Sequence, residues 1–319
     1  MITSVAARTL SRGLTILSGL VAFLIPINAA RGAEGQSSYY FPGTVSFGTA
    51  FEQPDSRGPS RGVQLISQGL LLGATVNHAI HAFAAYELNL VLYTLPKPVL
   101  GAQFQFGGYL PIGFSRVSFE GISQHDFGFA DIGLIPVGLY WHTRACSTAP
   151  CPGFHFKLAE GVFLPTGRYS SDRAVSVGRN YYAFDTSLAA SWFSGDAQNQ
   201  IGPLPGTEIT VVPGILLNER NTATDYRTGS EFHADFMINQ FLNPGLAVGA
   251  QGYYYDQVSD DTGAGAIFGP QRGRATGVGP ALLWQPIGGV SVVAKWLIDL
   301  HAVNRPKANY GQATVALVF

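Results

Sequence analysis

The stretch VSVVAKWLIDLH, residues 290–301, alternates between two kinds of side chain over its whole length. One set consists of Val290, Val292, Ala294, Trp296, Ile298 and Leu300, and the other of Ser291, Val293, Lys295, Leu297, Asp299 and His301. Because successive side chains of a strand point to opposite faces, this period of two predicts a β-strand whose charges lie on one face. Soluble sandwiches and membrane barrels both contain such strands, so this stretch alone leaves the two folds open.

The same alternation recurs along the chain. One segment places Phe232, Ala234, Phe236 and Ile238 opposite Glu231, His233, Asp235 and Asn239. Another places Ile80, Ala82, Ala84, Tyr86, Leu88, Leu90 and Leu92 opposite His81, Glu87 and Asn89. In a membrane barrel the apolar face contacts lipid and the polar face lines the lumen, which is the reverse of a soluble sheet. We therefore expect the apolar sets to point outward and the polar sets inward.

The number and spacing of these segments favour a closed barrel. The predicted strands lie near 61–75, 78–93, 99–111, 127–142, 154–165, 181–194, 207–218, 227–241, 245–258, 273–286, 290–303 and 309–319. Twelve is an even number, as expected for bacterial barrels, and longer polar connections mostly alternate with shorter ones. The connections 143–153 and 195–206 and the tight turn at Asn77 depart from this alternation.

Composition excludes the competing classes. Charged residues make up 12% of the 319 residues, about half of the usual ~25%. No Lys/Arg-rich stripe is available to bind nucleic acid, and the 12% of aromatic residues argues against disorder. After residue 33 no apolar run approaches the ~18 residues of a membrane-spanning helix. The sequence predicts an all-β, antiparallel transmembrane barrel.

The first 33 residues are typical of a secretory signal peptide. Arg8 and Arg12 precede an apolar stretch at residues 13–27, and cleavage is expected after Ala30 or Ala33. The expected division is a signal peptide at 1–33, a lead-in segment at 34–60 and the barrel at 61–319. Whether residues 39–51 add a strand or lie inside the lumen stays open.

The C-terminal residues agree with export to the bacterial outer membrane. Val315, Leu317 and Phe319 share one face of the last segment, and an aromatic C-terminus resembles the signal that barrel assembly machinery reads. Outer-membrane lipid and that machinery are therefore the expected partners. Cys146 and Cys151 lie close together in sequence, and in an exported chain we expect a disulfide between them. A metal site is not expected, since only His142 and His155 lie nearby.

Several short motifs occur in order along the chain: Asp131-Ile-Gly-Leu134, Phe163-Leu-Pro-Thr-Gly167, Gly252-Tyr-Tyr-Tyr-Asp-Gln257 with Asp260-Asp261, and Gly277-Val-Gly-Pro280. With the closing strand they resemble the outer-membrane barrel family named after the meta-pathway of phenol degradation (phenol MetA-type proteins). The resemblance spans about residue 41 to the C-terminus. It implies a barrel that admits hydrophobic or aromatic compounds. The family's Tyr-Gln pair is interrupted here by Asp256.

Neither an H-E-x-x-H motif nor a P-loop is present in the sequence. We expect no enzymatic activity, no cofactor and no metal. Aromatic pairs and triplets near segment ends, at 39–41, 140–141, 181–182 and 253–255, are interpreted as interfacial girdles.

The candidate functional residues are the polar side chains expected to line the lumen. They are His81, Glu87, Gln103, Gln105, His155, Lys157, Asp185, Glu208, Glu231, His233, Asp235, Lys295, Asp299 and His301. A lining of mixed sign selects little by charge and suits a small, weakly charged solute. The sequence therefore predicts passive uptake of small hydrophobic or aromatic compounds. The alternative is a closed structural or surface-interaction barrel, in which these charges only pair and stabilise the wall.

Overall fold

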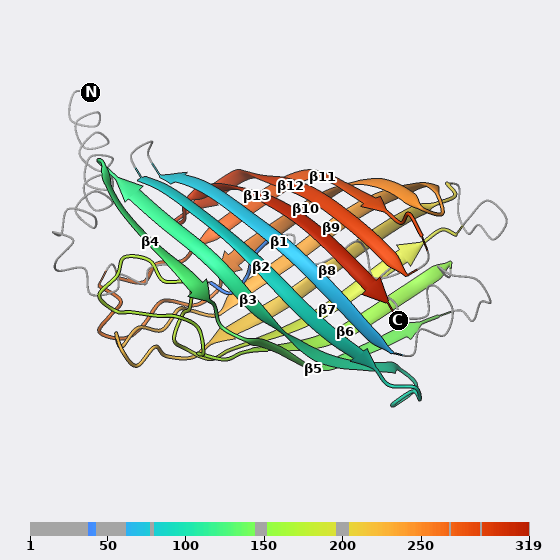
Figure 1. Ribbon diagram of the computed structural model, residues 1–319, viewed down its shortest axis with the longest axis horizontal. Coiled ribbons are helices and arrows are strands. Elements are labelled where there is room, and N and C mark those ends of the chain that lie inside the picture. Colours follow the sequence, from blue (N-terminus) through green and yellow to red (C-terminus); the bar gives the residue numbers. More distant parts are fainter. Residues whose placement is uncertain are drawn as a thin grey trace, which may run out of the picture.

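The computed structural model describes residues 38–42, 62–76, 80–143, 152–195, 204–267, 269–287 and 289–318. The described elements are thirteen β-strands (Figure 1). They are β1 (Val63–Val76), β2 (Ile80–Thr94), β3 (Gln103–Phe119), β4 (Ile122–Phe129), β5 (Gly133–His142), β6 (Gly153–Phe163), β7 (Ala183–Phe193), β8 (Thr207–Asn218), β9 (Glu231–Asn243), β10 (Leu246–Gln257), β11 (Arg274–Trp284), β12 (Val290–Val303) and β13 (Lys307–Val318). Within the described ranges no helix is long and apolar enough to cross a membrane.

The strands form one closed antiparallel barrel. β1 pairs with β2 on one side and with β13 on the other, from Gln64 opposite Val318 to Thr75 opposite Lys307. β4 and β5 both pair with β3: β4 with its second half and β5 with its first. They share one strand position, so the thirteen strands make the twelve-stranded barrel that the sequence predicted.

The β3–β4 region differs from the sequence prediction. Residues 112–126 were expected to form a polar loop, but they extend β3 and form most of β4. The turn consists of Glu120 and Gly121, both with positive φ (46° and 82°). Two such residues give the tight hairpin turn that matches strand twist. This hairpin lies beyond the strand break at residues 130–132, at the end of the barrel. Its sequence is therefore polar, like that of a loop.

The two faces of the barrel are inverted relative to a soluble sheet. On β12, Trp296 and Leu300 are 52% and 60% exposed, whereas Lys295 and Asp299 are 5% and 4% exposed. β9 repeats the pattern, with Phe236 and Ile238 exposed and the intervening residues buried. Apolar side chains therefore cover the outside and polar ones the inside, as predicted.

β2 has the opposite orientation to the one predicted. The pairing of β2 with β1 shows which face of β2 points inward. Leu70 of β1 is buried inside the barrel and lies opposite Tyr86 of β2, so Tyr86 is on the inner face. Leu92, on the same face as Tyr86, is buried, whereas Val91 is 50% exposed. The apolar set from Ile80 to Leu92 thus faces the lumen. An aromatic cluster that includes Tyr253, Tyr255 and Tyr310 packs against Leu72 of β1 and Ala82 of β2, so an apolar inner face is favourable there.

The two ends of the barrel differ. We call the end that holds Gly62 and Val318 the turn end and the opposite end the loop end. The loop end carries the β3–β4 hairpin and the connections 164–182, 219–230 and 258–273 (Figure 1). Longer loops are typical of the extracellular side of bacterial barrels.

Candidate functional site: the barrel lumen

A short N-terminal segment, Ser38–Pro42, lies inside the barrel. Its three aromatic rings contact the inner wall: Tyr39 stacks on Phe163, Tyr40 on His233, and Phe41 meets Tyr310 edge-on. These residues lie in the lumen and do not form an additional strand. None of the five belongs to a described strand. The segment therefore occupies the space through which a solute would pass.

Tyr39 is held near the loop end by both its hydroxyl and its ring. The hydroxyl donates to Asp131 Oδ2 at 2.8 Å and lies 2.9 Å from the carbonyl oxygen of Tyr181. The ring centroid lies 4.3 Å from that of Phe163, and the Arg179 guanidinium lies 5.6 Å from it. Burial raises the pKa of Tyr39 far above its ordinary value, and the charge of Asp131 raises it further.

Tyr40 lies deeper and contacts β9 and β10. Its hydroxyl donates to Asp235 Oδ2 at 3.2 Å. The ring lies 4.4 Å from the His233 ring and nearly parallel to Tyr255 at 5.9 Å. Burial raises the pKa of Tyr40 well above its ordinary value, with a further contribution from the Asp235 charge. Both phenols therefore stay neutral and act as hydrogen-bond donors.

The wall around the segment has an apolar side and a polar side. The apolar side is formed by β1 and β2 with Leu70, Leu72, Ala74, Ala82, Ala84, Tyr86, Leu88, Leu90 and Leu92. The polar side is formed mainly by β7 to β12. There His233 Nε2 lies 2.9 Å from Asp185 Oδ1, and Asp299 accepts from the Tyr253 hydroxyl and from the Ala308 amide. A lumen of this kind offers one surface to an apolar ring and the other to a hydroxyl.

Most of the predicted lumen residues lie on the inner face. They are Gln103, Gln105, His155, Lys157, Asp185, Glu208, Glu231, His233, Asp235, Lys295 and Asp299. The structure brings Glu231, His233, Asp235 and Asp185 together around Ser38 and Tyr40. Others lie toward the turn end, where Gln105 bonds Gln64 and Glu208 accepts from Asn239. Their part in solute passage stays a proposal.

Three of the predicted residues are corrected. His81 and Glu87 lie on the outer face, because β2 has the reversed orientation described above. Glu87 stands midway along β2 and accepts a 3.1 Å hydrogen bond from Ser67. His301 lies past an irregularity that skips one residue of β12, so it faces Thr276 on the outer surface and is exposed.

The girdle interpretation of the aromatic clusters is also wrong in part. Tyr140, Tyr181, Tyr253 and Tyr255 are buried inside the barrel, whereas Tyr182 is half-exposed on the outside. Since successive side chains of an extended chain point to opposite faces, the clusters at 140–141, 181–182 and 253–255 divide between lumen and lipid, whereas the cluster at 39–41 lies wholly in the lumen. The inner members form an aromatic lining rather than a ring at the membrane interface.

At the loop end, two motif pieces that are distant in sequence meet. Asp131, at the break between β4 and β5, accepts from the Gly167 amide at 2.7 Å and from the Arg179 amide at 2.6 Å. Thr166 Oγ1 accepts from the Ile132 amide at 3.0 Å. These bonds fold the 164–182 connection back over the mouth of the barrel.

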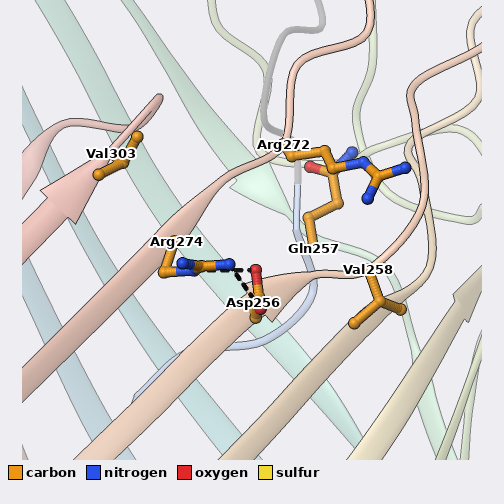
Figure 2. Close-up of a pocket in the computed structure, with 6 residues that line it drawn as sticks. All are labelled: Asp256, Gln257, Val258, Arg272, Arg274 and Val303. Carbon is orange, nitrogen blue, oxygen red and sulfur yellow. Dashed lines mark hydrogen bonds and ion pairs between the residues drawn. The ribbon is translucent and has the colours of Figure 1, made fainter.

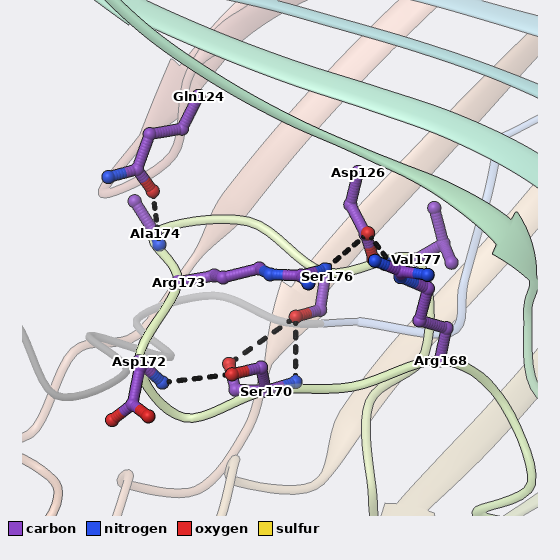
Figure 3. Close-up of polar contacts among 9 residues, drawn as sticks. All are labelled: Gln124, Asp126, Arg168, Ser170, Asp172, Arg173, Ala174, Ser176 and Val177. Atoms are coloured by element: carbon purple, nitrogen blue, oxygen red, sulfur yellow. Dashed lines mark hydrogen bonds and ion pairs between the residues drawn. The ribbon is translucent and has the colours of Figure 1, made fainter.

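A second acidic residue holds the same connection. Asp126 on β4 is buried and accepts from Arg168 at 2.7 Å, from Arg173 at 2.5 Å and from the Val177 amide at 3.2 Å (Figure 3). Gln124 accepts from the Ala174 amide at 2.8 Å. The β3–β4 hairpin thus forms a support for the loop.

The motif at residues 252–257, with Asp260 and Asp261, also forms loop contacts. Gln257 Nε2 donates to Asp261 Oδ1 at 2.6 Å, and Asp261 also accepts from the Tyr226 hydroxyl and the Gly229 amide. Asp260 pairs with Arg272 instead. The two aspartates therefore serve different partners, and no calcium-like cluster occurs among the residues that the structure describes. A shallow pocket beside them is bordered by the Asp256–Arg274 pair (Figure 2).

Several functional candidates escaped the sequence reasoning: Tyr39, Tyr40, Asp131 and Arg305. Arg305 lies 4.4 Å from the Tyr255 ring and donates to the Tyr310 hydroxyl. The aromatic run at 39–41 was the available signal, but its place in the lumen depends on contacts with β9, β10 and β13. The signal peptide and the Cys146–Cys151 disulfide lie outside the described residues and stay predictions.

Comparisons with known proteins agree with this architecture. An outer membrane channel from Pseudomonas putida F1 superimposes with a TM-score of 0.65 at 15% identity, covering 84% of this chain and 99% of that one. The transport unit of the autotransporter AIDA-I from Escherichia coli gives a TM-score of 0.48 at 9% identity, covering 92% and 99%. No curated protein matches the sequence.

At 15% identity the superposition on the Pseudomonas putida F1 channel shows the fold alone. A family model matches residues 72–315, which is most of the chain and includes all four motif pieces. This protein is an outer-membrane β-barrel and belongs to the family described as "Putative MetA-pathway of phenol degradation".

Proposed function

We propose that this barrel is a channel for passive uptake of small hydrophobic or aromatic compounds across the outer membrane. The observation that carries the proposal is the two-sided lumen, in which the apolar side of β1 and β2 faces carboxylates and aromatic rings on β9, β10 and β12. A small aromatic molecule with one polar group is complementary to both sides. A strongly anionic solute is disfavoured, because Glu231, Asp235 and Asp299 lie in its path.

Uptake by whole cells tests this proposal, because the intact outer membrane is a barrier to such compounds. Cells with and without the gene are supplied with labelled p-cresol at limiting concentration, and initial uptake is measured. We expect slower uptake without the gene and recovery on complementation. A hydrophilic sugar serves as the control solute, and its uptake is expected to stay unchanged. Equal p-cresol uptake in both strains would contradict the assignment.

A closed barrel is the second candidate, because Ser38–Pro42 fills part of the lumen. Single-channel recording separates the two. A channel whose segment moves gives transient openings, and a variant without residues 38–42 stays open for longer. A closed structural barrel gives no openings in either protein.

A further inference from the structure

The side chain of tyrosine is a p-cresol molecule joined to the backbone through its methyl carbon. A pocket that binds a tyrosine side chain through its ring and hydroxyl therefore has the groups needed to bind a free phenol. Two such pockets lie in the lumen, and Tyr39 and Tyr40 occupy them. We propose that these are binding sites for phenolic solutes, in which the solute competes with the chain's own tyrosines. The proposal rests on the channel function for its physiological role.

The first site has a complete set of contacts for a phenol. Asp131 Oδ2 accepts from the hydroxyl at 2.8 Å, and the Tyr181 carbonyl oxygen lies 2.9 Å from the hydroxyl oxygen as a second acceptor. Phe163 stacks on one face of the ring at 26°, and Tyr181 meets its edge at 5.3 Å. A bond from a hydroxyl to a carboxylate is a charge-assisted one and stronger than a neutral bond.

The second site repeats this design with other residues. Asp235 accepts the hydroxyl, while the rings of His233 and Tyr255 lie within 22° of parallel to the bound ring. The side chain that stacks most closely is itself fixed, since His233 bonds Asp185. The site therefore keeps its shape through contacts within the barrel wall.

The first site is likewise held by contacts that do not involve the segment. Asp131 accepts from the Gly167 and Arg179 amides. Those bonds secure the 164–182 connection, which follows Phe163 and contains Tyr181. Removing the tyrosine thus leaves acceptors and ring faces in place. A preformed site loses little free energy to ordering when a ligand binds.

Phe41 provides an internal comparison. It contacts Tyr310 edge-on at 5.3 Å and packs in the same aromatic cluster, but its ring carries no hydroxyl. A cavity at this position would accept an aromatic ring without preferring a phenol. Positions 39 and 40 would prefer the phenol, because a ring without a donor lacks the hydrogen bond that a hydroxyl makes to Asp131 or Asp235.

Cavity variants of the mature chain in lipid nanodiscs test the proposal. Tyr39→Ala and Tyr40→Ala each remove the aromatic ring and its hydroxyl, which is all of p-cresol except the methyl carbon, and Phe41→Ala is the matched control. Binding of p-cresol, toluene and 4-methylanisole is measured by calorimetry, with empty nanodiscs as the blank. We expect one saturable p-cresol site in each tyrosine variant and binding of the other two compounds about tenfold weaker. Phe41→Ala should bind toluene and p-cresol alike.

Two further measurements keep the test decisive. The double variant Tyr40→Ala/Asp235→Asn should lose the preference for p-cresol over toluene. In the otherwise wild-type chain, p-cresol should speed maleimide labelling of Ser38→Cys more than toluene does, because the solute displaces the segment. The heat-modifiable band shift verifies folding, and the labelling experiment needs no cavity if an alanine variant fails to fold.

The outcomes separate the site from the channel. Failure of both tyrosine variants to bind p-cresol, or equal binding of toluene, would overturn the two sites whatever the uptake experiment shows. Binding of p-cresol without any effect of the gene on uptake would instead refute the channel function and retain the sites.

Discussion

The backbone amide of Gly167 donates a 2.7 Å hydrogen bond to the carboxylate of Asp131, which joins the β6–β7 connection to the break between β4 and β5. The same carboxylate accepts from the Arg179 amide and from the Tyr39 hydroxyl. One buried side chain thus connects a strand break, a long loop and the segment in the lumen. A change at Asp131 is expected to affect all three.

Replacing Asp131 by alanine should release the loop and the segment together. The substitution leaves two part-buried amides without their acceptor, at about 1–3 kcal/mol for each unsatisfied group. The Tyr39 hydroxyl keeps only the Tyr181 carbonyl oxygen as its acceptor. We expect faster maleimide labelling of Ser38→Cys, faster tryptic cleavage within 164–182 and longer channel openings. Asp172→Ala is the control, because Asp172 lies exposed on the same loop. Unchanged labelling in Asp131→Ala would contradict this role.

Loss of either arginine that pairs with Asp126 should loosen the 164–182 connection less than loss of Asp126 itself. Arg168 and Arg173 have side chains 53% and 37% exposed, so solvent screens each ion pair and its loss costs at most about 1 kcal/mol. Asp126 is buried and also accepts from the Val177 amide. Limited proteolysis should therefore show a larger increase in loop cleavage for Asp126→Ala than for Arg168→Gln. Equal rates would show that the arginine pairs dominate.

Alkaline titration should reveal the buried phenols. The pKa of Tyr39 and of Tyr40 is raised in the folded barrel, so their contribution to holding the segment is complete below the ordinary value of about 10. It is lost only as the pH rises through the raised values. In a tyrosinate absorbance titration, Tyr40→Phe should remove signal from the late part of the curve. A loss from the early part would show that Tyr40 is accessible to water.

Glu87 is expected to reduce the stability of the barrel. It faces lipid midway along β2 with Ser67 as its hydrogen-bond donor. Acidic residues on a lipid face cost less than the ~2–4 kcal/mol of Arg or Lys, so Glu87→Leu should stabilise by about 1 kcal/mol. The midpoint of the heat-modifiable transition should rise.

Asp235→Leu provides the matched comparison on the inner face. It removes the acceptor of the Tyr40 hydroxyl, and the same midpoint should fall. If Glu87→Leu also lowers the midpoint, the outer surface of β2 is not in contact with hydrocarbon.

Strand positions and barrel closure were predictable because they depend on local alternation. Lys295 and Asp299 alternate with Trp296 and Leu300, and that pattern alone places the two charged residues on one face, which the structure shows to be the inner one. Glu87 shows the limit of this reasoning. Alternation defines two faces but not which one is inner, and the polar side is inner only where the lumen is polar. Beside the aromatic cluster the lumen is apolar, and the assignment of β2 is reversed.

The tyrosine sites were not predictable for a different reason. Tyr39 and Asp131 lie 92 positions apart, and Tyr40 and Asp235 lie 195 apart. The two residues of a pair do not share a local sequence motif. In addition, an aromatic run near a strand end is equally typical of a membrane interface. Only the closed fold brings them into contact.

The pairing of β1 with β13 constrains the order in which this molecule folds. Paired residues of these strands, such as Thr75 and Lys307, are far apart in the chain, so we expect the two strands to join late, after the intervening hairpins have formed. Phe41 meets Tyr310 on β13, the last strand to join. The N-terminal residues must therefore already be inside the curved sheet when it closes, or thread in through an open end afterwards, and refolding rates of a chain beginning at residue 43 would distinguish these two routes.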